Sequence, residues 1–271
     1  MARLFLLNHP ATEPGYHKRR IGSVCTVPWT TRLHRRKFIK FDGLYLEKGT
    51  LKSSTLCFWG EYEPYSEATI ISKTTPIAIH YNLLPVRSLP PMPNGALNTD
   101  PYVFGCFRNI CCKRGTTKYQ PGDIIVFGYF RTDSMFEFDT VIVVENLVPC
   151  NFVPANDQFR LASINPLKNA PETFVDGVMY SPKLKSKYYS FVPCLPNCNV
   201  SQTIEFTKPI LDTIALFGKN AKKGAWGHVF ANVPLDNVQK QHYWDEIRNA
   251  VKIAGLNEGV CVGKIDNEKS F

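Results

Sequence analysis

The chain has 271 residues, enough for one large domain or two small ones, and its apolar fraction of 44% excludes a disordered protein. No segment approaches the roughly 20 apolar residues needed to cross a bilayer, so the sequence predicts no membrane partner. The net charge of +9 is concentrated between residues 17 and 40, where eight lysines and arginines occur without an acidic residue.

Apolar runs predict the strands of the amino-terminal half. The first run, residues 3–7, is too short for a signal-peptide core, so we expect a strand and a cytoplasmic protein. Asp42-Gly43 is typical of a tight turn and predicts a hairpin between residues 38–41 and 44–46. Further strands are expected at residues 24–29, 55–59, 68–72 and 77–81. The proline-rich residues 84–100 predict a long ordered loop.

The carboxyl-terminal half contains the predicted helices. The turn at residues 121–123 leads into a strand at 124–130, which should pair antiparallel with residues 136–144. Thr207 is a possible cap for a helix at 209–217 that ends at Gly218. Asp236 can cap a clearer helix that extends to Ala254 and ends before Gly255. Two more strands are expected, at residues 226–233 and 260–265.

The order of these elements predicts the fold class. Many strands come first and the helices come late, which argues against alternating βαβ units. We therefore expect an α+β protein that is mostly β, with a mixed or antiparallel sheet, or a partly closed barrel, and a few peripheral helices. A single domain over residues 1–271 is expected, with a possible second lobe from about residue 150.

The basic block at residues 17–40 indicates an anionic partner. Such a block attracts polyanions through counterion release and long-range steering. The alternative is a solvated edge that keeps the protein soluble.

The stretch from Trp59 to Glu63 is the first candidate site, because a buried apolar run leads directly into two carboxylates. In an extended chain Trp59, Glu61 and Glu63 point to one face, and Tyr62 points to the other. The acids could share a proton or a cation, or accept hydrogen bonds from base amino groups. The alternative is a surface turn whose acids pair with nearby arginines.

A second candidate site, residues 100–114, interleaves aromatic and basic side chains. Tyr102 and Phe104 could stack a base while Lys113 pairs with a phosphate. Cys112, beside Lys113, could be a nucleophile with a lowered pKa, or else a packing residue. Farther along the chain, His228 could act as an acid or base, or pack in the core.

The nine cysteines predict free thiols, because their number is odd and no secretion signal precedes them. Cys194 and Cys198 have a spacing that zinc sites permit, but the adjacent Cys111 and Cys112 are poorly spaced to supply a second pair. We therefore predict no metal and no cofactor.

Four segments together carry a resemblance to a known family: Trp59–Ser66, Asp100–Gly105 with Cys112-Lys113, Gly122–Gly128 and Phe138–Val144. This succession resembles the bacterial nucleotide-modification-associated domain proteins, which are thought to sit beside DNA-modification or phage-defence genes. The strand pair that follows the Pro-Gly-Asp turn also resembles the core hairpin of PUA and ASCH domains, small β-barrels that bind RNA or modified bases. The resemblance covers residues 1–145 and implies a PUA-like barrel with a nucleic-acid or nucleotide function.

The leading hypothesis is a nucleic-acid- or nucleotide-binding protein of a bacterial DNA-modification or anti-phage defence system. An alternative is an enzyme acting on a nucleotide or modified base, with Glu61 or Glu63 as general acid/base assisted by Cys112 or His228. A third possibility is a structural partner in a larger complex, and no oligomeric state is predicted. The predicted ligand-binding residues are Arg19, Arg20, Arg35, Arg36, Lys37, Trp59, Tyr62, Tyr102, Phe104, Asn109 and Lys113.

Overall fold

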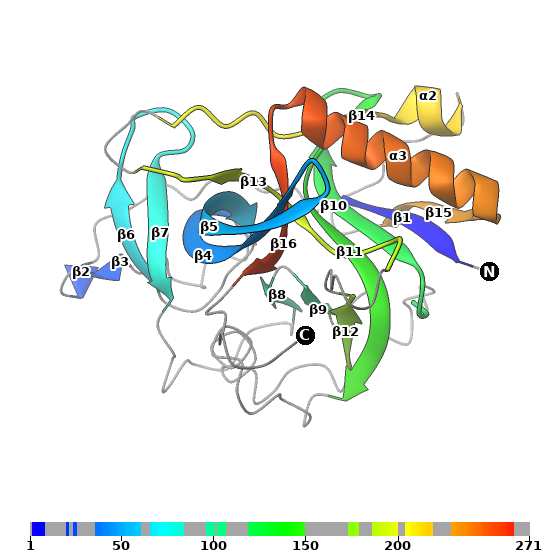
Figure 1. Cartoon of the computed structure of the whole chain (residues 1–271), viewed down its shortest axis with the longest axis horizontal. Helices are drawn as coiled ribbons and strands as arrows, with labels where there is room; N and C mark the ends of the chain where they lie inside the picture. Colours follow the sequence, from blue (N-terminus) through cyan, green and yellow to red (C-terminus); the bar gives the residue numbers. More distant parts are fainter. Residues whose placement is uncertain are drawn as a thin grey trace.

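A computed structural model describes residues 2–8, 20–21, 24–25, 36–60, 66–83, 96–100, 102–106, 119–149, 173–178, 186–199, 204–218 and 229–262. These residues form two sheets that meet at the centre of the molecule, with two helices along one side (Figure 1). The prediction of a mostly β protein with a few helices is confirmed for this part of the chain.

The first sheet has the strand order β15-β1-β10-β11-β12-β9-β8, and β14 pairs with β11 beside this path. Its strands are β1 (Arg3–Asn8), β8 (Ala96–Asp100), β9 (Val103–Cys106), β10 (Ile124–Phe130), β11 (Met135–Pro149), β12 (Thr173–Gly177), β14 (Ile210–Asp212) and β15 (Val229–Pro234). Strands β1 and β10 are parallel and the other pairs are antiparallel, so the sheet is mixed.

The second sheet has the order β16-β13-β5-β4-β7-β6-β3-β2, and β16 also pairs with β4. Four of its strands, β4, β5, β13 and β16, therefore form a closed ring. The strands of this sheet are β2 (Arg20–Ile21), β3 (Val24–Cys25), β4 (Lys37–Glu47), β5 (Thr50–Gly60), β6 (Ser66–Ile70), β7 (Ala78–Leu83), β13 (Val192–Pro196) and β16 (Asn257–Val262). Strands from after residue 150 pair with strands from before it in both sheets.

The hairpin of β4 and β5 turns at a different place from the one predicted. Asp42 and Gly43 lie inside β4, and the chain reverses at Lys48 and Gly49, where both φ angles are positive. Positive φ at two consecutive residues suits the tight turn of a hairpin. Gly43 has another role, because β16 approaches its Cα so closely that a side chain would overlap the Cys261 carbonyl oxygen. The predicted turn at Asp42-Gly43 is therefore wrong.

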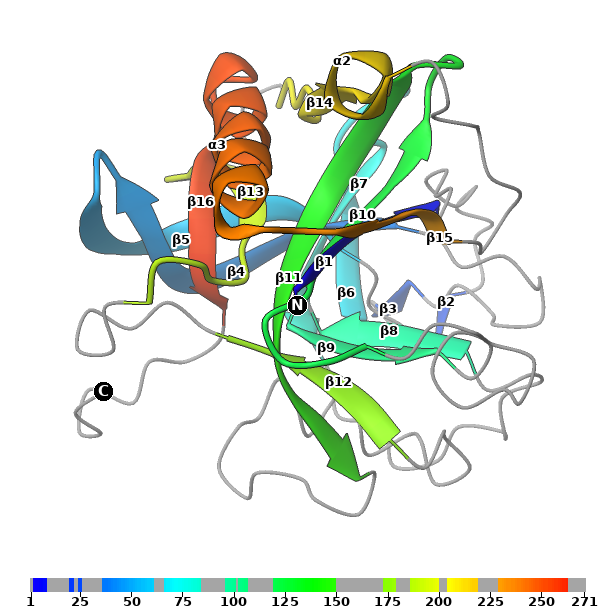
Figure 2. The same cartoon turned by 90° about the vertical axis from the view of Figure 1, so that its right-hand side faces the viewer.

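The long carboxyl-terminal helix is confirmed as α3 (Asn237–Ile253). Asp236 accepts hydrogen bonds from the backbone N–H groups of Val238 and Gln239, and the Gln239 side chain accepts one from the Asp236 N–H. This reciprocal cap fixes the start of the helix. Figure 2 shows α3 in front of β16, and Trp244, buried on the inner face of the helix, packs edge-on against the ring of Tyr189.

The other predicted helix is shorter than expected. Helix α2 (Thr213–Phe217) starts four residues later than predicted, and Asp212, not Thr207, caps it. The preceding residues form β14, because Ile210 and Leu211 pair with Glu137 and Phe136 of β11. Gly218 ends the helix, as predicted.

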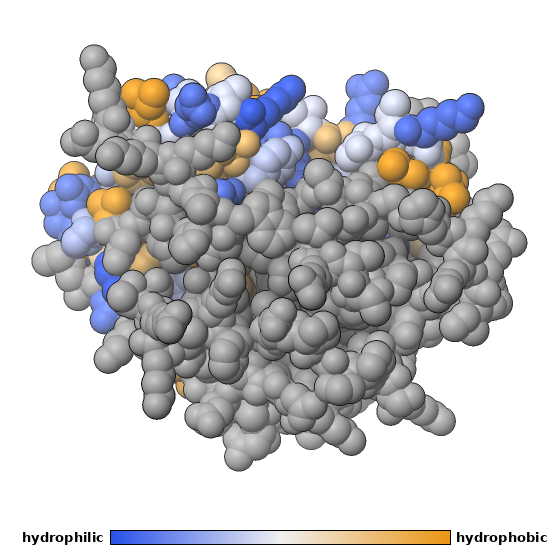
Figure 3. Space-filling view, turned by 180° about the vertical axis from the view of Figure 1, so that it is seen from behind, coloured by the Kyte–Doolittle hydropathy of each residue, from blue (hydrophilic) through white to orange (hydrophobic). Residues whose placement is uncertain are grey.

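The remaining predictions have mixed outcomes. Strand β10 has the predicted bounds and pairs antiparallel with β11, as expected. The loop prediction is wrong for residues 96–100, which form β8 against β9. Exposed large apolar side chains among the described residues are scattered over several elements. From behind, separate hydrophobic patches alternate with hydrophilic ones along the upper rim (Figure 3).

Candidate ligand-binding site

Five side chains from separate parts of the chain meet where the two sheets join. They are Arg36, directly before β4, Trp59 near the end of β5, Tyr129 of β10, Asp139 of β11 and Lys208, two residues before β14. We call this group the Lys208 cluster. Two of its members, Arg36 and Trp59, are predicted ligand-binding residues.

Local packing positions Trp59 and Lys208. Trp59 is opposite Phe38 in the β4–β5 register, so the two rings share a face and lie 5.2 Å apart. Phe206 packs edge-on against the same Phe38 ring at 5.3 Å. The anchored Phe206 places Lys208, two residues later, over the Trp59 ring.

Asp139 holds the two cations of the cluster. Its Oδ1 lies 3.3 Å from Nη1 of Arg36, and its Oδ2 lies 3.2 Å from Nζ of Lys208. The ammonium of Lys208 is 4.7 Å from the ring centre of Trp59 and 5.5 Å from that of Tyr129. Arg36 and Asp139 are 0% and 2% exposed, and Lys208 is 8% exposed. Charges are rarely buried to this extent without a structural or functional reason.

Tyr129 and Glu137 form the outer side of the cluster. They are opposite each other across β10 and β11, and both are partly exposed. Partial burial raises the pKa of Tyr129, and the charge of Glu137 raises it further, so the phenol stays protonated at neutral pH. The phenol is hydrogen-bonded to the Glu137 side chain, so this edge offers a ligand a partly exposed aromatic ring and a carboxylate.

The predicted residue Lys37 is oriented differently from Arg36. Successive residues of β4 alternate between faces, so Lys37 shares a face with Ile39, and His80 of β7 is opposite Ile39. Lys37 and His80 are both buried. Burial lowers the pKa of His80 well below its ordinary value, and the charge of Lys37 lowers it further. The imidazole is therefore neutral in the folded protein at neutral pH.

His80 should make the protein less stable in mild acid. Below pH 6.5, the ordinary pKa of the imidazole, the unfolded chain binds a proton at His80 and the folded protein does not. The free energy of unfolding is therefore highest above pH 6.5 and falls as the pH drops. The expected loss is about 1.4 kcal/mol per pH unit until the folded pKa is reached. Urea unfolding at several pH values between 5 and 7.5 measures this loss of stability.

The His80→Gln variant should lose this part of the dependence of unfolding free energy on pH. The control variant His242→Gln, at an exposed histidine, should retain it. Equal slopes in both variants would contradict the assignment.

Tyr102 and Phe104 lie in other parts of the core. The Tyr102 hydroxyl donates to the Gly259 carbonyl oxygen at 3.0 Å. Its aromatic side chain packs among apolar side chains of β4, β5, β13 and β16. Phe104 packs edge-on against Phe127 with 4.9 Å between ring centres. Both side chains are buried, and the structure does not bring them to the Lys208 cluster. Their stacking on a base stays a prediction.

The other predicted site residues lie outside the described residues, except that the backbone of Arg20 is part of β2. The roles assigned to them stay predictions. These residues are Arg19, Arg35, Glu61, Tyr62, Glu63, Asn109, Cys112, Lys113 and His228.

The expectation of free thiols is wrong for two cysteines. Cys57 and Cys198 form a disulfide, although 141 positions separate them in the sequence. The alternative of a zinc site at Cys194 and Cys198 is therefore ruled out, because the sulfur of Cys198 is already bonded. Cys194 keeps its thiol, and burial raises its pKa. Within the described residues, no group of three or more His, Cys, Asp or Glu side chains is placed to hold a metal ion.

Sequence reasoning missed Tyr129, Asp139 and Lys208. Asp139 had a signal, since it is a carboxylate inside the apolar run of residues 136–144, and buried acids in strands usually have a partner. Lys208 had none, because it lies between the predicted cap, Thr207, and the helix predicted at 209–217.

None of the helices described for this chain is both long and apolar enough to cross a membrane.

Comparisons with family models, with curated proteins and with solved structures find no match for this chain.

Proposed function

We propose that the protein binds nucleic acid or a nucleotide at the Lys208 cluster and serves in a bacterial DNA-modification or anti-phage defence system in the cytoplasm. Under this proposal β10 and β11, the strand pair that follows the Pro-Gly-Asp turn, are the core hairpin of the PUA-like fold that the sequence resemblance implies. The ligand contributes a phosphate for the cations and a flat base for the partly exposed ring of Tyr129, since the ring of Trp59 is buried.

The observation that supports this proposal most directly is the pairing of cations with aromatic rings in one cluster. Arg36 and Lys208 share the carboxylate of Asp139, so these three buried side chains have two positive charges and one negative charge. Glu137 at the outer side of the cluster adds a second negative charge, so a phosphate would compete with the two carboxylates for these cations. Arginine and lysine are the usual phosphate partners, and aromatic rings stack on bases of any sequence.

The charge of the whole chain favours the same partner. The net charge of +9, most of it between residues 17 and 40, attracts polyanions over long distances. Arg36 belongs to that basic block and is also a member of the Lys208 cluster, so the two groups share this residue. Binding through such charges weakens steeply with salt, because each phosphate contact releases condensed counterions.

Fluorescence anisotropy with a labelled single-stranded oligonucleotide of about 12 nucleotides tests the proposal. For four phosphate contacts, raising the salt from about 50 to 200 mM should weaken binding about 50-fold. Labelled ATP is the matched probe for a free nucleotide. Equal affinity at both salt concentrations, or no binding of either probe, would contradict the proposal.

The Lys208→Met variant tests whether the cluster is the site. It keeps the length of the side chain and removes the charge, so binding at low salt should weaken about tenfold or more. Lys52→Met is the control, because Lys52 is exposed on β5 and pairs with Glu47 away from the cluster. Equal binding by the two variants would exclude the Lys208 cluster as the site.

A further inference from the structure

A groove lies between α3 on one side and β14 and α2 on the other. Figure 1 and Figure 2 show these three elements together along the upper side of the molecule, and α3 packs against β14. The groove encloses about 330 Å³, a volume within the range of small-molecule binding sites. It is therefore large enough for a small organic ligand.

Direct contacts between the two helices hold the groove in shape. The hydroxyl of Tyr243 on α3 donates to the carbonyl oxygen of Leu216 on α2 at 3.2 Å. The Tyr243 ring also packs against Phe217, with 5.4 Å between ring centres. Asp212 accepts two backbone hydrogen bonds at the start of α2 and so fixes its first turn. Because the walls are already in place, a ligand does not lose the free energy of ordering them.

Apolar side chains make up most of the lining of the groove. Leu211 of β14 and Ala250 of α3 are buried at its base, and Ile210 and Leu216 are partly exposed. Ile253, in the last turn of α3, also lines the groove and is 79% exposed. Removing apolar surface of this kind from water favours binding in proportion to the area covered. The lining therefore suits a ligand with an apolar body.

Two carboxylates make the groove negative. Asp212 lies at the end of β14, and Glu246 lies on α3 one turn after His242. Within the part of the chain that the structure describes, neither carboxylate forms an ion pair, and the groove lining contains no lysine or arginine. The capping hydrogen bonds of Asp212 both go to Oδ1, so Oδ2 can accept from a ligand. A cation in the groove would meet two opposite charges without a competing lysine or arginine from the lining.

We propose that this groove binds a small organic ammonium ion with an apolar body, such as an aryl-alkyl amine. A primary ammonium has three N–H donors, enough for both Asp212 and Glu246. The apolar body covers Ile253 and the apolar base of the groove. The inference is independent of the function proposed above, because the groove shares no residue with the Lys208 cluster, and its carboxylates would repel a phosphate.

Titration of the full chain with phenethylamine tests the proposal. The carbon-13-labelled isoleucine methyl groups are observed by NMR, and their signals are assigned with the Ile210→Val and Ile253→Val variants. Phenethylamine should shift both signals saturably, with a Kd of about 1–10 mM. Phenethyl alcohol has nearly the same shape without the charge and should bind about fivefold more weakly. No saturable shift up to about 50 mM amine, or equal affinity for amine and alcohol, would overturn the proposal.

The double variant Asp212→Asn with Glu246→Gln tests whether these carboxylates select the amine. Asn caps a helix as well as Asp does, so α2 should keep its start, and Gln keeps the shape of Glu. The variant should bind amine and alcohol equally, with the affinity for the alcohol unchanged. A retained preference for the amine would overturn the roles of Asp212 and Glu246.

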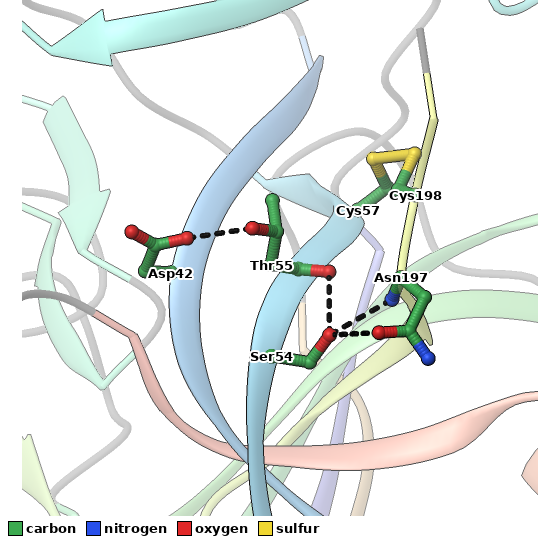
Figure 4. Close-up of a disulfide and its surroundings, with 6 residues drawn as sticks. All are labelled: Asp42, Ser54, Thr55, Cys57, Asn197 and Cys198. Carbon is green, nitrogen blue, oxygen red and sulfur yellow. Dashed lines mark hydrogen bonds between the residues drawn. A yellow bond between two sulfur atoms is a disulfide. The ribbon is translucent and has the colours of Figure 1, made fainter.

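The matched control removes two negative charges outside the groove. Asp42→Asn acts on β4, where Asp42 accepts a hydrogen bond from Thr55 (Figure 4), and Asp245→Asn acts on α3, where Asp245 accepts one from Gln241. This double variant should keep the fivefold preference for the amine. Loss of the preference in the control as well would assign it to the charge of the whole protein and overturn the groove as its source.

A lysine derivative distinguishes a free amine from a lysine of a protein partner. Its ammonium matches that of phenethylamine, but its body is a flexible chain joined to a polar backbone. The acetylated, amidated lysine monomer should therefore bind at least about threefold more weakly than phenethylamine, since less apolar surface is covered. Tighter binding of the lysine derivative would assign the groove to a protein segment and overturn the small-molecule proposal.

Discussion

Asp139→Asn is expected to destabilise the protein by about 3–5 kcal/mol. Asn has the same shape as Asp, so the change removes the charge while leaving the packing between the sheets in place. Arg36 and Lys208 would then remain buried around a neutral amide. Removing one partner of a buried ion pair is costly because the charge left behind is neither solvated nor neutralised.

Urea unfolding followed by circular dichroism measures this loss. The control is Asp42→Asn on β4, where an exposed carboxylate accepts a hydrogen bond from Thr55. The control should cost no more than about 1 kcal/mol, because water solvates whatever is left unpaired. If Asp139→Asn cost as little as the control, Asp139 would not be what neutralises the cluster.

The same variant bears on the proposed site. Asp139 holds Lys208 in position, so its loss should also weaken oligonucleotide binding even though the site gains net positive charge. A variant that folds and binds more tightly would show that Asp139 competes with the phosphate and does not position the lysine. Binding is therefore measured without urea, at a temperature where circular dichroism shows the variant to be folded.

The parts of the fold that sequence analysis predicted are those with local signals. Strand β10 follows a Pro-Gly-Asp turn and consists almost entirely of apolar residues, and its bounds agree with the prediction. Helix α3 has a capping Asp236, an apolar face and Gly255 after its end. In each case a few neighbouring residues determine the conformation.

The failures depend on partners that are distant in sequence. Ile210 and Leu211 form a strand because β11 is beside them, and nothing in their own neighbourhood indicates that pairing. Cys57 and Cys198 are 141 positions apart, and pairing of cysteines cannot be deduced from spacing alone.

The candidate site was predictable to the same limited extent. Arg36 and Trp59 were identified by composition, since one belongs to a basic block and the other ends a buried strand. Asp139 and Lys208, which complete the cluster, come from segments 69 positions apart. Only the packing of the two sheets brings all four side chains together.

Gly43→Ala should destabilise the protein by about 3 kcal/mol, because Gly43 lies where the ring of strands closes. Gly43 is opposite Val262 of β16 and Ser54 of β5, so strands flank it on both sides. A methyl group at this position would overlap the carbonyl oxygen of Cys261 and lie 2.8 Å from Cδ1 of Leu56. Backbone cannot move away as the end of a flexible side chain does, so β16 would have to separate from β4.

Gly49→Ala is the matched control, since Gly49 lies at the turn of the same hairpin. Its φ angle is +80° and no atom lies within 4 Å of the place that an alanine methyl group would take, so this variant is strained in its backbone but meets no neighbour. It should cost about 1 kcal/mol. Thermal unfolding of both variants compares the two effects. A larger loss for Gly49→Ala would indicate that the hairpin turn, and not the contact between β4 and β16, limits the stability of the ring.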